Sequence, residues 1–173
     1  VIDLQNGGCW DRTTDAHIEY VDSTMIRGWR FSRGWADDQK IYFHAEFSKP
    51  FKDLHIHSVN YVPSYAKADF DSDEVLMKVA LSPVSMEGAY ENMKAELPGW
   101  DFRKTAAEAD RAWNEELSKI RIKTRDEEAR KIFYTALYHT MIAPSTFCDT
   151  DGSYRGADGK TYGNPGYNTY TTF

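Results

Sequence analysis

The sequence has few cysteines, no long apolar run and no excess of positive charge, and each absence excludes something. Its two cysteines, Cys9 and Cys148, fit no metal-ligand spacing and leave the redox compartment undecided. No stretch of about 18 apolar residues is present, so we expect no membrane span. A net charge of −6 and a pI near 5.4 argue against nucleic acid or an anionic membrane surface as a partner.

The sequence also lacks the motifs of several common enzyme classes. It contains no G-x-S-x-G, P-loop or dinucleotide-binding fingerprint. Residues 149–154, DTDGSY, begin like a calcium-binding loop, but Tyr154 and Lys160 stand where an EF-hand requires glycine and an acidic residue. Two interpretations fit this segment better. It is a loop of Asx turns, or a loop whose polar side chains contact sugar hydroxyls.

The five histidines include one pair with suggestive spacing. His55 and His57 would share one face of a strand, where two metal ligands can lie, but no third ligand is near them in the sequence. A surface strand is the favoured reading of this pair. His139 lies in an aromatic helical segment, where a hydrogen-bonded core histidine is the default.

Aromatic residues are abundant, at 14% of the chain. This enrichment suits carbohydrate binding, because the C–H faces of sugars stack on aromatic rings, and it suits a large core equally well. By that default most of the tryptophans belong to the core. Trp35 follows Gly34, so we expect it in a turn, where its ring can be exposed for stacking.

The pattern of apolar residues divides the chain near residue 84. Before it, apolar residues alternate with polar ones around 26–31 and 41–47, which predicts short strands of an antiparallel sandwich. After it, three helices are predicted, capped by Ser85, by Asp101 and by a T-x-x-E capping box at Thr124 and Glu127. The third carries apolar residues on two faces, which predicts burial between layers. The fold class is therefore α+β.

Five blocks, in this order, resemble glycoside hydrolase family 92, the exo-acting α-mannosidases. The blocks are GWRFSRGWADDQKIYFHAEFSKPF (28–51), VLMKVALSPVSMEGAYENMKAELPGWDF (75–102), AWNEELSKI (112–120), FYTALYHTMIAP (133–144) and DTDGSYRGADG (149–159). The resemblance implies part of an N-terminal β-sandwich (1–84), linker helices (85–123) and the first helix of an (α/α)6 catalytic barrel (124–173). We expect strands to be missing upstream.

The resemblance also implies an activity. The family removes terminal mannose from α-mannosides, often α-1,2-linked, with inversion and with calcium. A Glu acid and an Asp base would do the chemistry. The family pattern places both residues and the calcium ligands downstream of Phe173, so no catalytic or metal-binding residue is assigned here. The implied partners are mannose-containing glycans and the remainder of the parent protein, in a bacterial periplasm or outside the cell.

Site candidates are limited to the loop from Ser145 to Phe173, which would lie on the rim of the barrel. Asp149, Asp151, Tyr154 and Arg155 are the predicted substrate-binding residues, and the alternative is that they brace the loop structurally. We expect the 173 residues alone to be inactive. The competing hypothesis is a complete, non-catalytic carbohydrate-binding or scaffolding module, which would cover the third helix instead of leaving one side open.

Overall fold

The structure is a computed structural model that describes residues 1–6, 10–60 and 62–171. These residues form two compact units. The first comprises Val1–Pro98 and Cys148–Thr169, and the second comprises Gly99–Phe147 and Tyr170–Phe173. Cys9 lies outside the described residues. Cys148 is a free, half-buried cysteine whose Sγ accepts a hydrogen bond of 3.4 Å from the Thr169 amide.

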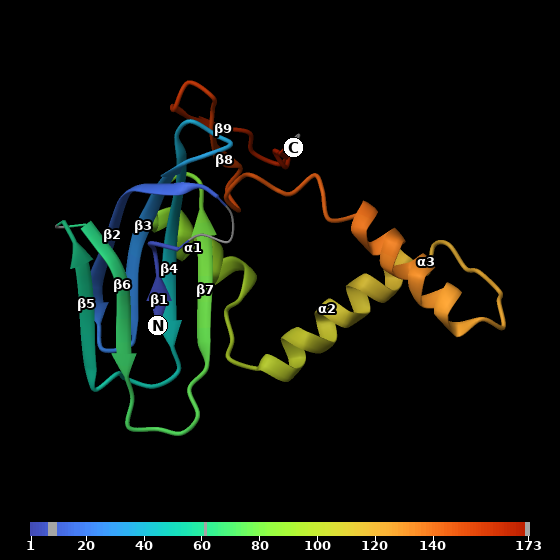
Figure 1. The fold of residues 1–173 in the computed structure, drawn as a ribbon, viewed down its shortest axis with the longest axis horizontal. Helices are drawn as coiled ribbons and strands as arrows, with labels where there is room; N and C mark the ends of the chain where they lie inside the picture. Colours follow the sequence, from blue (N-terminus) through green and yellow to red (C-terminus); the bar gives the residue numbers. More distant parts are fainter. Residues whose placement is uncertain (7–9, 61, 172–173) are drawn as a thin grey trace. The chain divides into compact units, whose positions relative to one another are not determined.

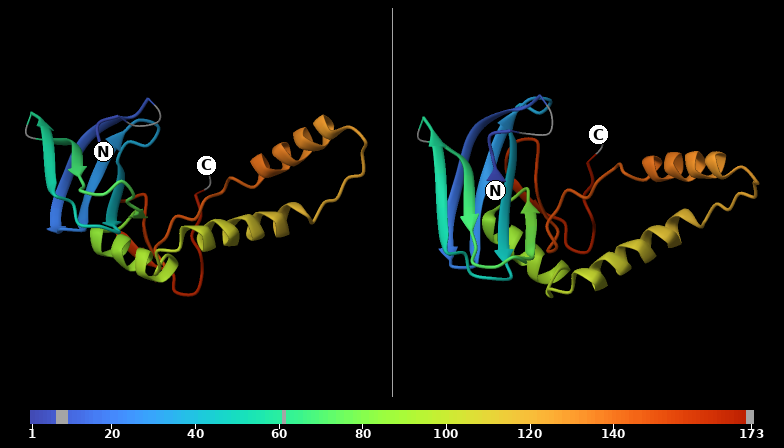
Figure 2. Two further views of the ribbon diagram at one scale, coloured as in Figure 1. Left: turned by 90° about the horizontal axis from the view of Figure 1, so that it is seen from below. Right: turned by 60° about the horizontal axis from the view of Figure 1, so that its bottom comes forward.

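The first unit is built on two antiparallel sheets (Figure 1). The three-stranded sheet has the order β1-β6-β5 and contains β1 (Ile2–Asp3), β6 (Val62–Asp69) and β5 (Asp53–Val59). The four-stranded sheet has the order β2-β3-β4-β7 and contains β2 (Arg12–Asp22), β3 (Met25–Arg33), β4 (Gln39–Phe47) and β7 (Met77–Ser82). Two further views show the sheets as layers of one sandwich (Figure 2). The predicted α+β class and antiparallel sandwich are confirmed.

Alternation along β3 and β4 decides which side chains form the core. Ile26 of β3 is paired with Ala45 of β4, and both are buried between the sheets. Trp29 and Phe31 have the opposite parity, so they lie on the outer face of the four-stranded sheet. The core cluster is Leu4, Ala16, Ile18, Ile26, Phe43, Ala45, Phe47, Phe51 and Ala66.

Helix α1 (Met86–Glu96) packs against the outer face of the four-stranded sheet, beside β4 and β7. His44 points to this face, and its ring lies 4.8 Å from that of Tyr90 on the helix. Burial lowers the pKa of His44. Ala89 and Met93 give the helix its buried side, and the predicted cap at Ser85 is confirmed, because its side chain accepts a hydrogen bond from the Gly88 amide.

Strand β7 has an apolar ridge, which we define as Met77, Val79 and Leu81. These residues are paired with Phe47, Ala45 and Phe43, so they share the core-facing side of the sheet, yet they are 46–57% exposed. β7 is also an edge strand. Exposed apolar side chains on a sheet edge promote self-association.

We therefore expect the triple variant Met77→Thr, Val79→Thr, Leu81→Thr to aggregate less than the native chain of 173 residues, because threonine keeps the strand propensity and removes apolar surface. Light scattering during concentration measures the effect. The matched control is Val59→Thr, which changes a single exposed residue at the end of β5 and should leave aggregation unchanged. Equal scattering by the triple variant and the native chain would contradict the prediction.

The second unit contains α2 (Phe102–Leu117) and α3 (Glu127–Thr140). The two helices meet where the ring of Trp113 lies 4.6 Å from that of Tyr138 in an edge-to-face contact. The prediction that α3 is buried between layers is wrong for this chain. None of its residues is buried, and Ile132 is 62% exposed, because α2 packs along one side and leaves the other apolar side open.

The helix caps of this unit were predicted in part. Asp101 caps α2 as expected, with its side chain accepting from the Lys104 amide. The T-x-x-E box is wrong. Asp126 is the cap of α3, and one carboxylate oxygen accepts from the amides of Glu128 and Ala129, both at 3.0 Å. Thr124 instead accepts from the Asp126 amide and so orients the true cap.

Candidate functional site

The candidate site is the acidic segment of residues 148–169, which belongs to the same compact unit as the sandwich. It contains the hairpin of β8 (Ser153–Arg155) and β9 (Thr161–Gly163). Gly152 begins the hairpin with φ of 84°, and a Cβ there would lie 2.6 Å from the carbonyl oxygen of Asn164. Glycine is therefore required at 152 for both backbone conformation and space.

Asp149 is the centre of a buried polar cluster, defined here as Asp149, Ser82 and Asn92. The Asp149 side chain is only 5% exposed. One carboxylate oxygen accepts from the Ser82 hydroxyl at 2.7 Å, and the other accepts from the Asn92 amide nitrogen at 2.8 Å. The cluster joins the loop to the end of β7 and to the middle of α1.

Every side chain of this cluster has hydrogen-bond partners. Ser82 Oγ accepts from the amides of Val84 and Ser85, so its own hydrogen is left for Asp149. Asn92 donates its second hydrogen to the Leu81 carbonyl, and its oxygen accepts from the Thr150 amide at 2.8 Å. A buried polar network in which every member has partners fixes one geometry, so these contacts hold the start of the loop in place.

Gly88 of α1 makes room for this cluster. A Cβ at that position would lie 2.3 Å from Asp149 Oδ2 and 2.8 Å from Ser82 Oγ. Glycine inside a helix costs about 1 kcal/mol relative to alanine. Close approach of the loop to the helix explains why the sequence tolerates that cost here.

The ionisation of Asp149 depends on its burial. Desolvation raises the pKa of this carboxyl above its ordinary value of 3.8, against the hydrogen bonds from Ser82 and Asn92, which lower it. A carboxyl with a raised native pKa contributes stability that is present at pH below the ordinary pKa and is lost as the pH rises through the native pKa.

This linkage predicts a pH dependence. We expect the free energy of unfolding of the native chain to fall relative to that of the Asp149→Asn variant as the pH rises from about 3.5 to about 7. The variant carries no titrating group at position 149, so its stability at each pH is the baseline for the native chain. Urea titrations of both proteins across that range measure the difference, and a difference that stays constant with pH would contradict the assignment.

Arg155 anchors the other end of the first hairpin strand. Its Nε donates to the Pro83 carbonyl at 2.9 Å, and Nη2 donates to the Val84 carbonyl at 3.3 Å and to the Tyr42 hydroxyl at 3.4 Å. Nη1 donates to the Gly159 carbonyl within the hairpin turn. The guanidinium therefore joins the hairpin to β4 and to the segment that precedes α1.

Asp151 and Tyr154 are less constrained by the sandwich. The carboxylate oxygens of Asp151 accept from the amide and hydroxyl of Ser153 at 2.8 and 3.0 Å, which forms the predicted Asx turn, and the residue is exposed. Tyr154 is half-buried and stacks on Tyr162, with ring centroids 5.9 Å apart. The exposed carboxylate of Asp151 has lone pairs left for further donors.

The structure thus separates the four predicted substrate-binding residues into two pairs. Asp149 and Arg155 bond to groups of the sandwich and of α1 and position the loop, whereas Asp151 contacts Ser153 and Tyr154 contacts Tyr162, both within the loop. Sequence reasoning missed Ser82, Asn92, Tyr42 and Gly88, which receive the loop. A glycine within the first turn of α1 was the signal available for Gly88. The predicted place of this loop on a barrel rim stays a prediction.

Within residues 1–6, 10–60 and 62–171, no three histidine, cysteine or acidic side chains come close enough to hold a metal ion. His55 lies 3.1 Å from an oxygen of Asp53, and His57 stacks on Tyr65 at 4.8 Å, so both belong to an exposed strand face. In the same described part of the chain, no helix combines the length and hydropathy needed to cross a bilayer.

Two family models, one after the other, together match almost the whole chain. Residues 1–82 match the glycosyl hydrolase family 92 N-terminal domain, and residues 88–173 match the glycosyl hydrolase family 92 catalytic domain. Only residues 83–87 lie between the two matches. A curated relative, an uncharacterized secreted glycosidase of Arthroderma benhamiae, is 34% identical over 77 residues, which are 42% of this chain and 10% of that protein.

Solved structures of the same family share the fold. The family GH92 alpha-mannosidase BT3965 from Bacteroides thetaiotaomicron is 30% identical over 94% of this chain, with a TM-score of 0.83. The inverting mannosidase BT2199 from the same species is 22% identical over 92% of this chain, with a TM-score of 0.77, and supports the fold alone. The chain spans 24% of the length of each.

Proposed function

This chain belongs to glycosyl hydrolase family 92, and on that premise we propose that it acts within an enzyme that removes terminal α-linked mannose from glycans. The observation that carries the proposal is the ordered match of two family models over almost the whole chain. The likeness to a named alpha-mannosidase, which was also solved with mannoimidazole bound, supports mannose as the sugar. The proposed linkage is α-1,2.

The proposed reaction is single-step hydrolysis with inversion. A carboxylic acid protonates the glycosidic oxygen, and a carboxylate on the other face of the ring activates water. We assign neither group to this chain. Its contribution is the sandwich and the anchored loop, on which Asp151 and Tyr154 contact sugar hydroxyls while Asp149 and Arg155 hold the loop in position.

Calcium dependence is part of the proposal for the complete enzyme. Among the described residues, no three histidine, cysteine or acidic side chains come together to hold a metal ion, so we derive no step through calcium here. The remainder of the parent protein is the proposed source of the calcium site and of the catalytic acid and base. The barrel that would begin at residue 124, after linker helices at 85–123, belongs to the same proposal.

We propose that the enzyme acts outside the cytoplasm. The relative named as a secreted glycosidase supports export from the cytoplasm, to the periplasm or outside the cell. The proposal predicts that the mature enzyme is recovered in a periplasmic or culture-medium fraction.

Mannose release from α-1,2-, α-1,3- and α-1,6-mannobiose by the complete polypeptide tests the activity. We expect release, fastest from the α-1,2 disaccharide, and loss of release after a calcium chelator is added. The chain of 173 residues is the matched control and should release none. Failure of the complete polypeptide on all three disaccharides would sink the proposal, and activity of the control would overturn the assignment of the catalytic groups to other parts of the enzyme.

A further inference from the structure

Two exposed tryptophans form a pair at one end of the sandwich. Trp10 is 70% exposed and Trp35 is 81% exposed, and their rings meet edge to face with centroids 6.5 Å apart and planes at 75°. Exposing two indoles leaves apolar surface in contact with water, which disfavours the arrangement unless the rings have a use. The exposure that the sequence suggested for Trp35 is confirmed.

Trp29, on the four-stranded sheet, is packed differently from Trp10 and Trp35. Trp29 is stacked on His17 at 4.4 Å and on Phe31 at 5.8 Å, and its Nε1 donates to Asp15. That indole is therefore packed against neighbouring rings and hydrogen-bonded through its nitrogen. The rings of Trp10 and Trp35, at 75° to each other, instead form the two walls of a corner.

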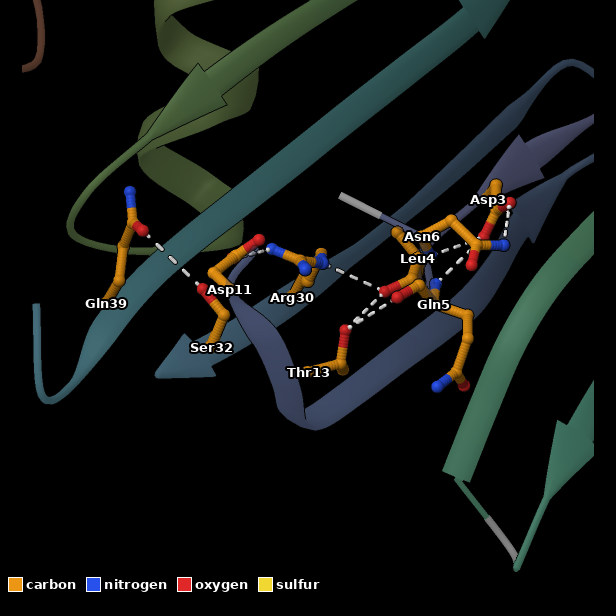
Figure 3. Close-up of polar contacts among 9 residues, drawn as sticks. All are labelled: Asp3, Leu4, Gln5, Asn6, Asp11, Thr13, Arg30, Ser32 and Gln39. Atoms are coloured by element: carbon orange, nitrogen blue, oxygen red, sulfur yellow. Dashed lines mark hydrogen bonds and ion pairs between the residues drawn. The ribbon is translucent and has the colours of Figure 1, made fainter. Parts of the chain in front are cut away.

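The segments that carry the two tryptophans are held by charged and close contacts. Arg30 donates from Nη1 to Asp11 at 2.8 Å and from Nε to the Leu4 carbonyl at 2.9 Å (Figure 3), which ties the segment next to Trp10 onto β3. A Cβ on Gly34 would lie 2.7 Å from Asp11 Cβ, so the two loops touch directly. Because Trp10 precedes Asp11 and Trp35 follows Gly34, these contacts set the spacing of the two rings.

The hairpin that carries Trp35 is rich in charged side chains. Arg33 forms an ion pair with Asp37 at 3.1 Å, and Lys40 forms one with Asp38 at 3.1 Å. These groups lie in the same β3–β4 hairpin as Trp35, and charged side chains of these kinds can exchange hydrogen bonds with hydroxyl groups. Aromatic walls with a polar rim match a pyranose ring, which has apolar C–H faces and an equator of hydroxyls.

The size of the patch argues against a protein partner. A stable protein interface buries about 800 Å² on each side and has an apolar centre. Here the residues that follow Trp35, from Ala36 to Gln39, are exposed and mostly polar, so the exposed apolar surface of that loop is the indole of Trp35 itself.

We propose that Trp10 and Trp35 form a carbohydrate-stacking site, separate from the anchored loop, that binds a pyranose unit of an α-mannose-rich glycan. The pyranose class follows from the geometry of the pair and its rim. The choice of mannose rests on the proposed function. Such a site would hold a polymeric substrate on the sandwich while the reaction takes place elsewhere in the enzyme.

The test measures binding without hydrolysis. The chain of 173 residues is run in native gels that contain yeast α-mannan, in gels that contain β-1,4-glucan, and in gels without polysaccharide. We expect retardation by α-mannan only. In the Trp10→Ala and Trp35→Ala variants the dissociation constant should rise about tenfold each, since each variant loses one wall. Tyr20→Ala is the control, because it removes an exposed aromatic ring from β2.

Each result of these measurements supports or overturns the proposed carbohydrate-stacking site. Retardation that is lost in the tryptophan variants and kept in the control, with unchanged melting temperatures, supports the site. Absence of binding by the native chain, binding unaffected in the double variant, or equal binding to β-1,4-glucan overturns the proposal. A lowered melting temperature without a change in binding shows that the indoles pack structurally, which also overturns it. Mannose release by the complete polypeptide is measured independently, so failure here leaves the proposed reaction intact.

Discussion

Replacing Asp149 with alanine should lower the free energy of unfolding of the sandwich unit by about 3 kcal/mol. The change leaves the Ser82 hydroxyl and one Asn92 hydrogen buried without their acceptor, and these were bonded to Asp149 at 2.7 and 2.8 Å. It also releases the start of the loop from β7 and α1. Urea denaturation measures the stability, and limited proteolysis within residues 150–160 measures the release of the loop.

Two control variants isolate the cause of this effect. Asp151→Ala removes a neighbouring acid whose hydrogen bonds stay within the loop, so it should cost less than about 1 kcal/mol. Asp149→Asn keeps the volume and one acceptor oxygen and should fall between the two. Equal stability of Asp149→Ala and Asp151→Ala would mean that the buried cluster does not anchor the loop.

Replacing Gly28 with alanine should cost at least about 3 kcal/mol. Gly28 lies in the middle of β3, opposite Ile18, and a Cβ there would lie 1.9 Å from the carbonyl oxygen of His17 and 2.9 Å from the Phe43 ring. The oxygen belongs to the backbone of the neighbouring strand, so it can move only if the pairing of β2 with β3 is disturbed. Thermal and urea unfolding of the variant measure the cost.

Gly99→Ala provides the matched control, because a Cβ at Gly99 meets nothing within 4 Å. We expect it to change stability by less than about 0.5 kcal/mol. The comparison separates loss of a particular close approach from the general effect of adding a methyl group. A Gly28→Ala variant as stable as Gly99→Ala would show that β2 and β3 are not packed as described.

Features that depend on neighbours in sequence were predictable. Alternation around residues 41–47 predicted β4, and polar residues before the apolar runs predicted the caps at Ser85 and Asp101. The third cap failed because Thr124 and Asp126 are both good caps two residues apart, and local preference does not rank them. The structure selects Asp126, which bonds two amides of the first turn.

Features that depend on distant partners were not predictable. Asp149 looked like an exposed loop acid, but Ser82 and Asn92, 67 and 57 residues away, bury it. Arg155 likewise bonds to Pro83 and Tyr42, at separations of 72 and 113 residues. No periodicity or spacing in the sequence reports such contacts. Trp35 was predictable because a glycine in the adjacent position indicates a turn.

The most direct test of the central claim is the stereochemistry of the reaction. Proton NMR of the complete polypeptide acting on an aryl α-mannoside identifies the anomer of mannose that forms first, before mutarotation. We expect β-mannose, since an inverting enzyme replaces the α-linked group in a single displacement. First formation of α-mannose, or no mannose at all, would contradict the proposal that this chain is part of an inverting α-mannosidase.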